Sequence, residues 1–448
     1  MRALFLLALA AAAASAEPPR FVLTLAEAEA SGREHSLRLK AAAQESAAAR
    51  DRSEEQFSAL LPRLTLDGSY RYQTEVPSLS LAAGQPARPF GDHRATSVGP
   101  TLSWTLWDEG ALIKSWKAQK SRAASKGEEE RLAASQSVLG VRLAYAQAQL
   151  AGEQLRLLSD SLSLAEAQYK DIESRFKAGA ASRIELLSSH QDVLARRKQF
   201  LQAESDLSGA LRELLQLTGL GEGLDLSRPS DVRLSSRLVA GLREPTVLVR
   251  FDDLSVVPPS LASAETFGPD VAHPSVQTFR RQAEGARMTA RALAAGRWPV
   301  VRLTARAGYD YPNGPVLESV SQKSVGLTAS LPLFEGRQSA LAASQQEHLA
   351  QAAERRGDLA AEELARDWDK ARAALGCLRE QEEVDDRSIS ETDELSRLVY
   401  LSYKAGSSNY LEVQSANLRA LEAKVQAART RAQVLIQLSI LADLAPRG

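Results

Sequence analysis

The sequence predicts a mainly α-helical protein with a membrane β part, built as a tandem repeat of two strands plus long coiled-coil helices. Short motifs of the first half return in the second half in the same order. Long stretches place apolar or small residues in alternating steps of three and four, as coiled coils do. Four segments alternate apolar and polar residues, as half-buried strands do.

Composition and charge narrow the class of protein. The chain has 55 Lys and Arg against 56 Asp and Glu, so it lacks the basic excess of a nucleic-acid-binding protein. The mean hydropathy of −0.25 is far too low for a bundle of membrane-spanning helices. The single cysteine, Cys377, rules out a disulfide within the chain and a cysteine-based zinc site.

Residues 1–16 have the pattern of a secretory signal peptide. Arg2 precedes an apolar run from Leu4 to Ala14, and Ala14-Ser15-Ala16 supplies small residues for cleavage after Ala16. An uncleaved N-terminal anchor is the alternative. No later segment has the ~18 uninterrupted apolar residues of a spanning helix. We therefore expect an exported chain that can enter a membrane only as a β-barrel.

The repeat is clearest at two turn motifs. Phe176-Lys177-Ala178-Gly179 returns as Tyr403-Lys404-Ala405-Gly406. Long helices explain why matching motifs stay a nearly constant number of residues apart, because an insertion within a helix would rotate every later contact. The predicted parts are a first repeat over 17–219, an inter-repeat segment over 220–270 and a second repeat over 271–448.

Each repeat is expected to contain a helix, two strands, a very long helix, a turn and a further helix. In the first repeat these elements are predicted at 23–60, 63–75, 95–107, 110–176 and 183–217. In the second repeat they are predicted at 271–297, 300–311, 323–333, 337–403 and 410–443. Several prolines and glycines in 220–270 predict little long regular structure there.

The four predicted strands suit a membrane barrel around a wet lumen, since each is about ten residues long with one apolar face. By this alternation Leu102, Trp104, Leu303 and Leu327 face lipid. The alternative is a soluble four-stranded sheet covered by helices on one side. Four strands cannot close a membrane barrel, because the smallest have about eight. A spanning chain must therefore oligomerise, and two copies would supply eight strands and three copies twelve.

Several motifs together resemble those of the TolC family of outer-membrane efflux proteins. They are Leu23-Thr24-Leu25-Ala26-Glu27-Ala28, the paired Leu61-Pro62 and Trp298-Pro299, the two Lys-Ala-Gly turns, and Leu217-Thr218-Gly219. The resemblance covers nearly all of the chain after the signal peptide. It implies a homotrimer with a shared twelve-strand β-barrel in the cell outer membrane and a periplasmic α-barrel, with 220–270 at the equator.

The same resemblance implies function and partners. The trimer would be a passive duct that conducts substrates from an inner-membrane pump and a periplasmic adaptor to the exterior. The two turns would dock the adaptor through Lys177, Gly179, Ser182, Lys404, Gly406 and Ser408. A periplasmic gate would use Glu412, Glu185 and Tyr403, with Tyr403 hydrogen-bonded to Glu185.

The gate departs from the family pattern at two positions. Ser415 replaces a second ring acid, so the ring would carry fewer charges, and Ser408 replaces an arginine, so a second hydrogen-bond link of the gate would be missing. A purely structural role is the alternative for both features. Glu185 and Glu412 would then be first-turn acids favoured by the helix dipole, and Gly179 and Gly406 would only end helices.

No catalytic or metal-binding pattern stands out. The five histidines lack ligand spacing, and the Gly219-x-Gly221-x-Gly223 stretch follows a helix and not a strand, unlike a phosphate-binding loop. We expect no enzyme activity and no cofactor, with Cys377 as a small packing residue of a long helix. The remaining alternative is a periplasmic or secreted coiled-coil scaffold without a pore.

Overall fold

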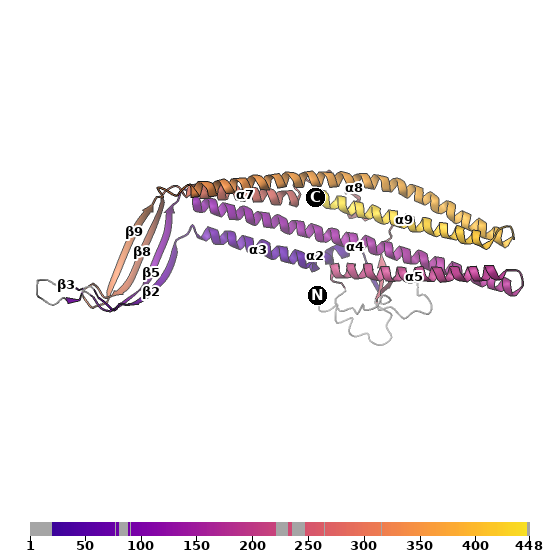
Figure 1. The fold of residues 1–448 in the computed structure, drawn as a ribbon, viewed down its shortest axis with the longest axis horizontal. Helices are drawn as coiled ribbons and strands as arrows, with labels where there is room; N and C mark the ends of the chain where they lie inside the picture. The colour runs from indigo at the N-terminus through magenta and orange to yellow at the C-terminus, as the bar shows by residue number, and fades with distance from the viewer. Residues whose placement is uncertain are drawn as a thin grey trace. The chain divides into compact units, whose positions relative to one another are not determined.

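The computed structural model describes residues 20–76, 78–79, 88–89, 91–220, 232–234, 247–263, 265–314 and 316–445. The predicted signal peptide lies outside these residues. The chain divides into two compact units. The first contains the chain up to Ala41, Leu132–His273 and the chain from Glu362; the second contains Ala42–Arg131 and Pro274–Ala361. Each unit is described separately below (Figure 1).

The described elements follow the predicted order of helices and strands in both repeats. The helices are α2 Leu25–His35, α3 Leu37–Ser58, α4 Ala111–Lys177, α5 Arg183–Thr218, α6 Pro259–Ala262, α7 Pro274–Ala295, α8 Gln338–Lys404 and α9 Tyr410–Leu444. The strands are β1 Arg20–Leu23, β2 Arg63–Tyr72, β3 Ser78–Leu79, β4 Arg88–Pro89, β5 Arg94–Trp107, β6 Val232–Leu234, β7 Val247–Phe251, β8 Val300–Tyr311 and β9 Val320–Ser330. This mainly helical class with long helices and a strand portion confirms the predicted fold class.

The first unit contains two helical hairpins, formed by α4 from Leu132 onward with α5 and by α8 from Glu362 onward with α9 (Figure 1). On α5 the buried residues Phe200, Leu207, Leu211 and Leu214 recur at the spacing of one helix face. Much of the remaining core is alanine, which lets helix backbones approach closely. Leucine and alanine together therefore fill the contacts between the helices of this wall.

The predicted first helix over 23–60 is wrong as a single element. Leu23 belongs to β1, and the helical stretch is divided at Ser36 into α2 and α3. The Ser36 hydroxyl accepts the N–H of Leu39 at 3.2 Å and lies 2.8 Å from the hydroxyl of Ser137. Ser36 thus caps the second helix, which is the usual role of serine at a helix start.

The described part of the inter-repeat segment forms a small parallel sheet with the N-terminal strand. Strand β7 lies between β1 and β6. The buried Tyr145 on α4 secures this sheet, because its hydroxyl lies 2.8 Å from the Leu23 carbonyl and 3.0 Å from the Asp252 carboxylate. The segment therefore joins the helical wall through buried polar contacts.

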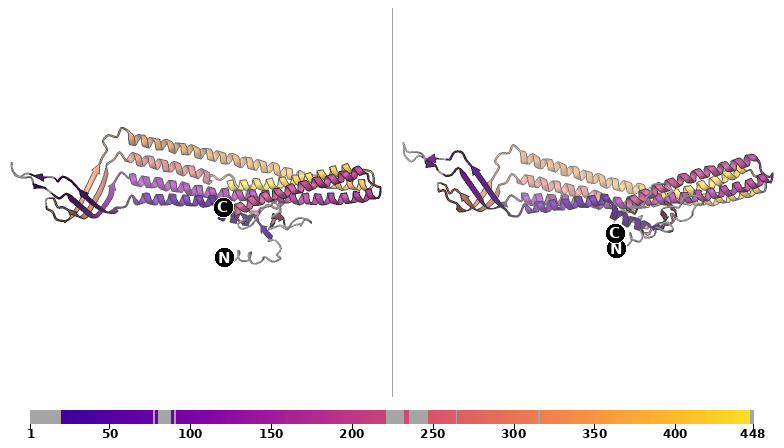
Figure 2. Two further views of the ribbon diagram at one scale, coloured as in Figure 1. Left: turned by 60° about the horizontal axis from the view of Figure 1, so that its bottom comes forward. Right: turned by 90° about the horizontal axis from the view of Figure 1, so that it is seen from below.

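The second unit carries an antiparallel sheet in the order β2-β5-β8-β9 (Figure 2). Leu64, Leu102, Ala305 and Val325 form one row across the four strands. The adjacent row is polar and contains Thr65, Thr101, Arg306 and Ser324. Since residues directly opposite one another share a face, the sheet has one apolar and one polar side.

Two further observations concern the helices. Cys377 is exposed on α8, so the expected packing role is wrong for the single chain. The buried residues Leu375 and Leu378 flank it on a different face of the helix.

Within the ranges that the structure describes, no helix is both long and apolar enough to cross a membrane.

Candidate functional site

The two hairpin turns have the same backbone geometry, as the repeat predicts. Gly179 and Gly406 end α4 and α8 with φ values of 76° and 82°, in the left-handed region that glycine adopts at low cost. The next residue in each turn donates its N–H back five residues, from Ala180 to Arg175 at 2.8 Å and from Ser407 to Ser402 at 3.1 Å. Both helices therefore end in Schellman-type caps.

The two candidate gate acids both cap the helix that follows their turn. Glu185 and Ser182 form a reciprocal capping box, in which the Glu185 carboxylate accepts the Ser182 N–H at 2.7 Å. Glu412 donates its N–H to the Asn409 side chain at 3.0 Å, and its carboxylate accepts from Asn409 and from the Ser408 hydroxyl. Each acid thus has a structural role in one chain, whatever it does in an assembly.

Between the turns lies a small aromatic cluster. Tyr403 and Tyr410 have ring centroids 5.9 Å apart and pack with Ile172 and Val413, and all four side chains are buried. The guanidinium of Arg175 lies over the Tyr403 ring, 5.4 Å from its centroid. Burial raises the pKa of Tyr403, and the negative charge of Glu185 adds to the effect. The cluster holds the ends of α4, α8 and α9 together.

The structure brings Tyr403 and Glu185 close in space without joining them by a hydrogen bond. The Glu185 carboxylate is used by the N-cap of α5, while the Tyr403 ring faces Tyr410 and Arg175. The expected hydrogen bond between Tyr403 and Glu185 is therefore not made in the single chain. Their role as a gate stays a prediction.

The remaining residues of the turns divide into exposed and capping groups. Lys177 and Lys404 are exposed, with Lys177 paired to Glu173 at 3.0 Å and Lys404 lying over the Tyr400 ring. Ser182 is an exposed N-cap, and Ser408 bonds Glu412. The exposed surface of the turns thus combines the lysine, glycine and alanine of each motif with serine, at Ser182 and Ser407, and with the apolar Ile184.

A polar seam between the two hairpins was missed at the level of sequence. Asn417 on α9 donates to Gln168 on α4 at 3.1 Å and accepts from Ser396 on α8 at 2.7 Å. Gln414 bonds Ser188 of α5 in the same region. The available signal was the presence of amides and serines at seam positions where leucine would fit, which indicates hydrogen bonding between helices.

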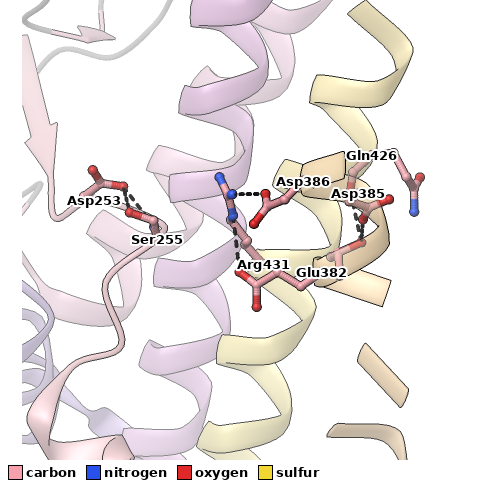
Figure 3. A network of polar contacts seen from close by, with 8 residues as sticks. Asp253, Ser255, Glu382, Asp385, Asp386, Gln426 and Arg431 are labelled. Atoms are coloured by element: carbon pink, nitrogen blue, oxygen red, sulfur yellow. Dashed lines mark hydrogen bonds and ion pairs between the residues drawn. The ribbon is translucent and has the colours of Figure 1, made fainter. Parts of the chain in front are cut away.

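A second polar network lies farther along the first unit (Figure 3). Arg431 of α9 contacts Asp386 at 2.7 Å and Glu382 at 3.3 Å, both on α8. It also lines a cavity of about 840 Å³ together with Asp253 and residues of α4. The pKa of Asp253 is lowered, chiefly because the backbone N–H and hydroxyl of Ser255 donate to its carboxylate. Acids four residues apart on α8 were the sequence signal for this contact.

The predicted lipid-facing residues lie on one face of the sheet. Trp104, Leu303 and Leu327 are direct neighbours across β5, β8 and β9, and Leu102 belongs to the adjoining row of the same face. On the opposite face Arg306 pairs with Asp310 at 2.7 Å. The shared face is observed, while its contact with lipid is a prediction. Among the described residues no group of three or more potential ligands could hold a metal ion.

Long helical hairpins joined to a two-faced antiparallel sheet define the class of outer-membrane channel with a helical extension. The family model for "Outer membrane efflux protein" matches residues 31–220 and 271–445. The chain therefore belongs to the outer membrane efflux protein family, which confirms the resemblance found in the sequence. No curated protein matches the chain.

Solved structures show the same fold at low identity. A membrane protein from Pseudomonas aeruginosa superposes with a TM-score of 0.75 at 19% identity, covering 94% of this chain and 93% of that one. VceC, an outer membrane protein from Vibrio cholerae, gives 0.73 at 15% identity over 94% and 95%. The open-state MtrE outer membrane channel from Neisseria gonorrhoeae gives 0.70 at 20% identity over 94% and 88%.

Family membership settles the broad function. The protein is an outer-membrane duct of an efflux system and not an enzyme, as expected from the sequence. Its place in the cell is the outer membrane.

Proposed function

We propose that three copies of this chain close one twelve-strand barrel, through which substrates pass passively to the exterior. The observation that carries the proposal is the two-faced sheet with β2 and β9 at its edges. Each edge strand has a neighbour on one side only within the described sheet, and an unpaired edge is not tolerated in lipid.

The strand directions suit closure by identical copies. The three pairings within the sheet are all antiparallel, so β2 and β9 run in opposite directions. Strand β9 of one copy can therefore pair with β2 of the next in the same antiparallel sense. Three copies supply twelve strands, an even number well above the minimum of about eight for a membrane barrel.

The domain organisation that goes with this proposal has two structural repeats, over 17–219 and 271–448, separated by an equatorial segment over 220–270. The parallel sheet of β1, β7 and β6 supports the equatorial assignment, since it ties that segment to the N-terminal strand. The two hairpin turns would then lie at the periplasmic end of the helices.

The turns are the proposed site for a periplasmic adaptor, which in turn joins an inner-membrane pump. Their matching Schellman geometry supports this role, because it presents equivalent surfaces at two places in each copy and six in a trimer. The exposed Lys177 and Lys404 give both surfaces a positive group. Glu185, Glu412 and Tyr403 are the proposed gate, with the carboxylates favouring cations where three copies converge.

Single-channel recording on the purified protein tests the duct. We expect ion-conducting events in a planar bilayer, and a mass in detergent equal to three chains. A non-conducting assembly, or a single chain that stays stable in detergent, would support the coiled-coil scaffold instead.

A further inference from the structure

A hollow lies where the membrane sheet meets the helices of the second unit. It has a volume of about 610 Å³ and is lined by Trp107, Arg297, Trp298, Pro299 and Leu331. These residues come from the end of β5, the connection between α7 and β8, and the residue after β9. The hollow therefore joins three segments that are far apart in sequence.

A β-bulge places Trp107 on the apolar side of the sheet. Thr105 pairs with Arg302, but the next pairing of β5 joins Trp107 to Val301, so Leu106 is the extra residue. Without the bulge Trp107 would share the face of Arg302. Because Val301 lies on the face of Leu303, the bulge turns the indole toward the lipid side.

Arg297 gives this apolar hollow one positive charge. The residue is exposed, and among the described residues its polar contact is a long 3.5 Å approach of Nε to the Ala294 carbonyl. No acidic side chain pairs with it among the residues that the structure describes. An arginine without a carboxylate partner that lines a hollow together with two tryptophans suits a phosphate with an apolar tail. Guanidinium binds phosphate in two-point geometry, and tryptophan favours the membrane interface.

We propose that this hollow binds the headgroup phosphate of a phospholipid from the periplasmic leaflet of the outer membrane. Arg297 holds the phosphate, Trp107 and Trp298 flank the glycerol region, and an acyl chain lies along Leu331 and Leu333. Both leucines are exposed in the single chain, Leu333 by 90%. The inference rests on the proposed barrel, since only that arrangement places the apolar face in lipid.

Native mass spectrometry of the purified full-length protein tests the site. The protein is titrated with phosphatidylglycerol and, separately, with diacylglycerol of the same acyl chains, which lacks the phosphate. We expect phosphatidylglycerol to bind at least fivefold more tightly per chain, and Arg297→Ala to abolish that preference. Arg297→Lys should retain part of it, because a point charge still attracts phosphate.

Arg302→Ala is the matched control. It removes a cation from the start of β8, the strand that follows Arg297, but from the polar face of the sheet, so lipid binding should equal that of the wild type. Bound lipid is counted per chain in whichever oligomer is isolated. Failure to form a trimer would therefore contradict the proposed barrel without deciding whether the lipid site exists.

Three results would overturn the lipid site. Equal binding of both lipids would show a merely apolar surface, and unchanged binding in Arg297→Ala would remove the arginine from the site. Loss of the trimer in Arg297→Ala with unchanged lipid per chain would make the hollow a contact between copies.

Discussion

The hydroxyl of Tyr145 lies 3.0 Å from the carboxylate of Asp252, a residue 107 positions away in the sequence. The same hydroxyl accepts the backbone N–H of Asp252 at 3.1 Å, while the Asp252 carboxylate accepts the N–H of Leu25. One buried phenol thus connects α4, the N-terminal helix and the inter-repeat segment. A buried polar contact of this kind is costly to break, because the groups left behind are unpaired.

Tyr145→Phe should therefore destabilise the protein by about 1–3 kcal/mol, the cost of unsatisfied buried groups. Tyr169→Phe is the control, since that ring is half-buried and packs at a tilt against His190. Denaturant unfolding of the detergent-solubilised protein measures both. A Tyr145→Phe variant as stable as Tyr169→Phe would show that the hydrogen bonds of the Tyr145 hydroxyl contribute little to stability.

Tyr410→Phe should not lower the free energy of unfolding, in contrast to Tyr145→Phe. The Tyr410 side chain is buried, and its hydroxyl has no hydrogen-bond partner among the described residues. Removing an unsatisfied hydroxyl should leave stability unchanged or raise it, by up to about 1–3 kcal/mol. A clear loss of stability would show that the hydroxyl gains a partner in the assembled protein.

High pH should weaken the fold through the same two tyrosines. Burial raises the pKa of both Tyr145 and Tyr410 above the ordinary value of about 10. The unfolded chain therefore loses these protons first, and stability present below about pH 10 should fall as the pH rises further. The slope of unfolding free energy against pH should be shallower in the Tyr145→Phe, Tyr410→Phe double variant, and an unchanged slope would assign the effect to other groups.

The sheet faces can be tested with a matched pair on β8. Leu303→Arg places a charge on the apolar face and should cost about 2–4 kcal/mol at mid-depth, whereas Thr304→Arg on the other face should be tolerated. The measurement is the fraction of heat-modifiable trimer in outer-membrane extracts. Equal losses from both variants would contradict the assignment of lipid and lumen faces.

The docking turns are best tested without disturbing the caps, since Ser182 and Ser408 both bond first-turn acids. Ala178→Trp and Ala405→Trp add bulk at equivalent exposed positions of the two turns. Export should fall in the double variant while the trimer remains intact, and Ala167→Trp on exposed α4 serves as the control. Normal export from the double variant would place adaptor docking elsewhere.

If Glu412 and Tyr403 belong to the gate, their substitution should change the conductance of the channel and not the stability of the protein. Glu412→Gln should weaken cation selectivity, and Tyr403→Phe should raise the resting conductance, both in single-channel recordings. Gln at 412 can still accept from Asn409, so the cap of α9 is retained. Wild-type behaviour in both variants would leave these residues with the capping and packing roles seen in one chain.

Periodicity predicted the long helices well, because α4 and α8 repeat their packing positions over many turns and leave little freedom in register. The division at Ser36 was missed because a serine within an alanine-rich stretch does not by itself interrupt helical spacing. The bulge at Leu106 was missed for a similar reason: strict alternation assigns Trp107 to the polar face, and only the pairing with Val301 corrects it.

The candidate site was predicted unevenly. The turns around Gly179 and Gly406 follow from the repeated motif, since their left-handed backbone is a local property. The seam between Asn417 and Gln168 depends on how two hairpins meet, which spacing along one helix does not encode. Roles that require neighbouring copies, such as the ring of Glu412, lie beyond what one chain contains.

The central claim is that β9 of one copy pairs with β2 of the next, and disulfide trapping between these edges tests it most directly. Cysteines are introduced in a Cys377→Ser background at Thr65 or Ser69 of β2, together with Ser324 or Thr328 of β9. Within one chain two strands separate these edges, so at about 4.8 Å per strand the Cα atoms lie beyond the roughly 7 Å limit for a disulfide. We predict covalent dimers and trimers from at least one such pair, and none when Ser97 of the central strand β5 replaces the β2 position. Monomers alone from every edge pair, in protein extracted from the outer membrane, would contradict the shared barrel.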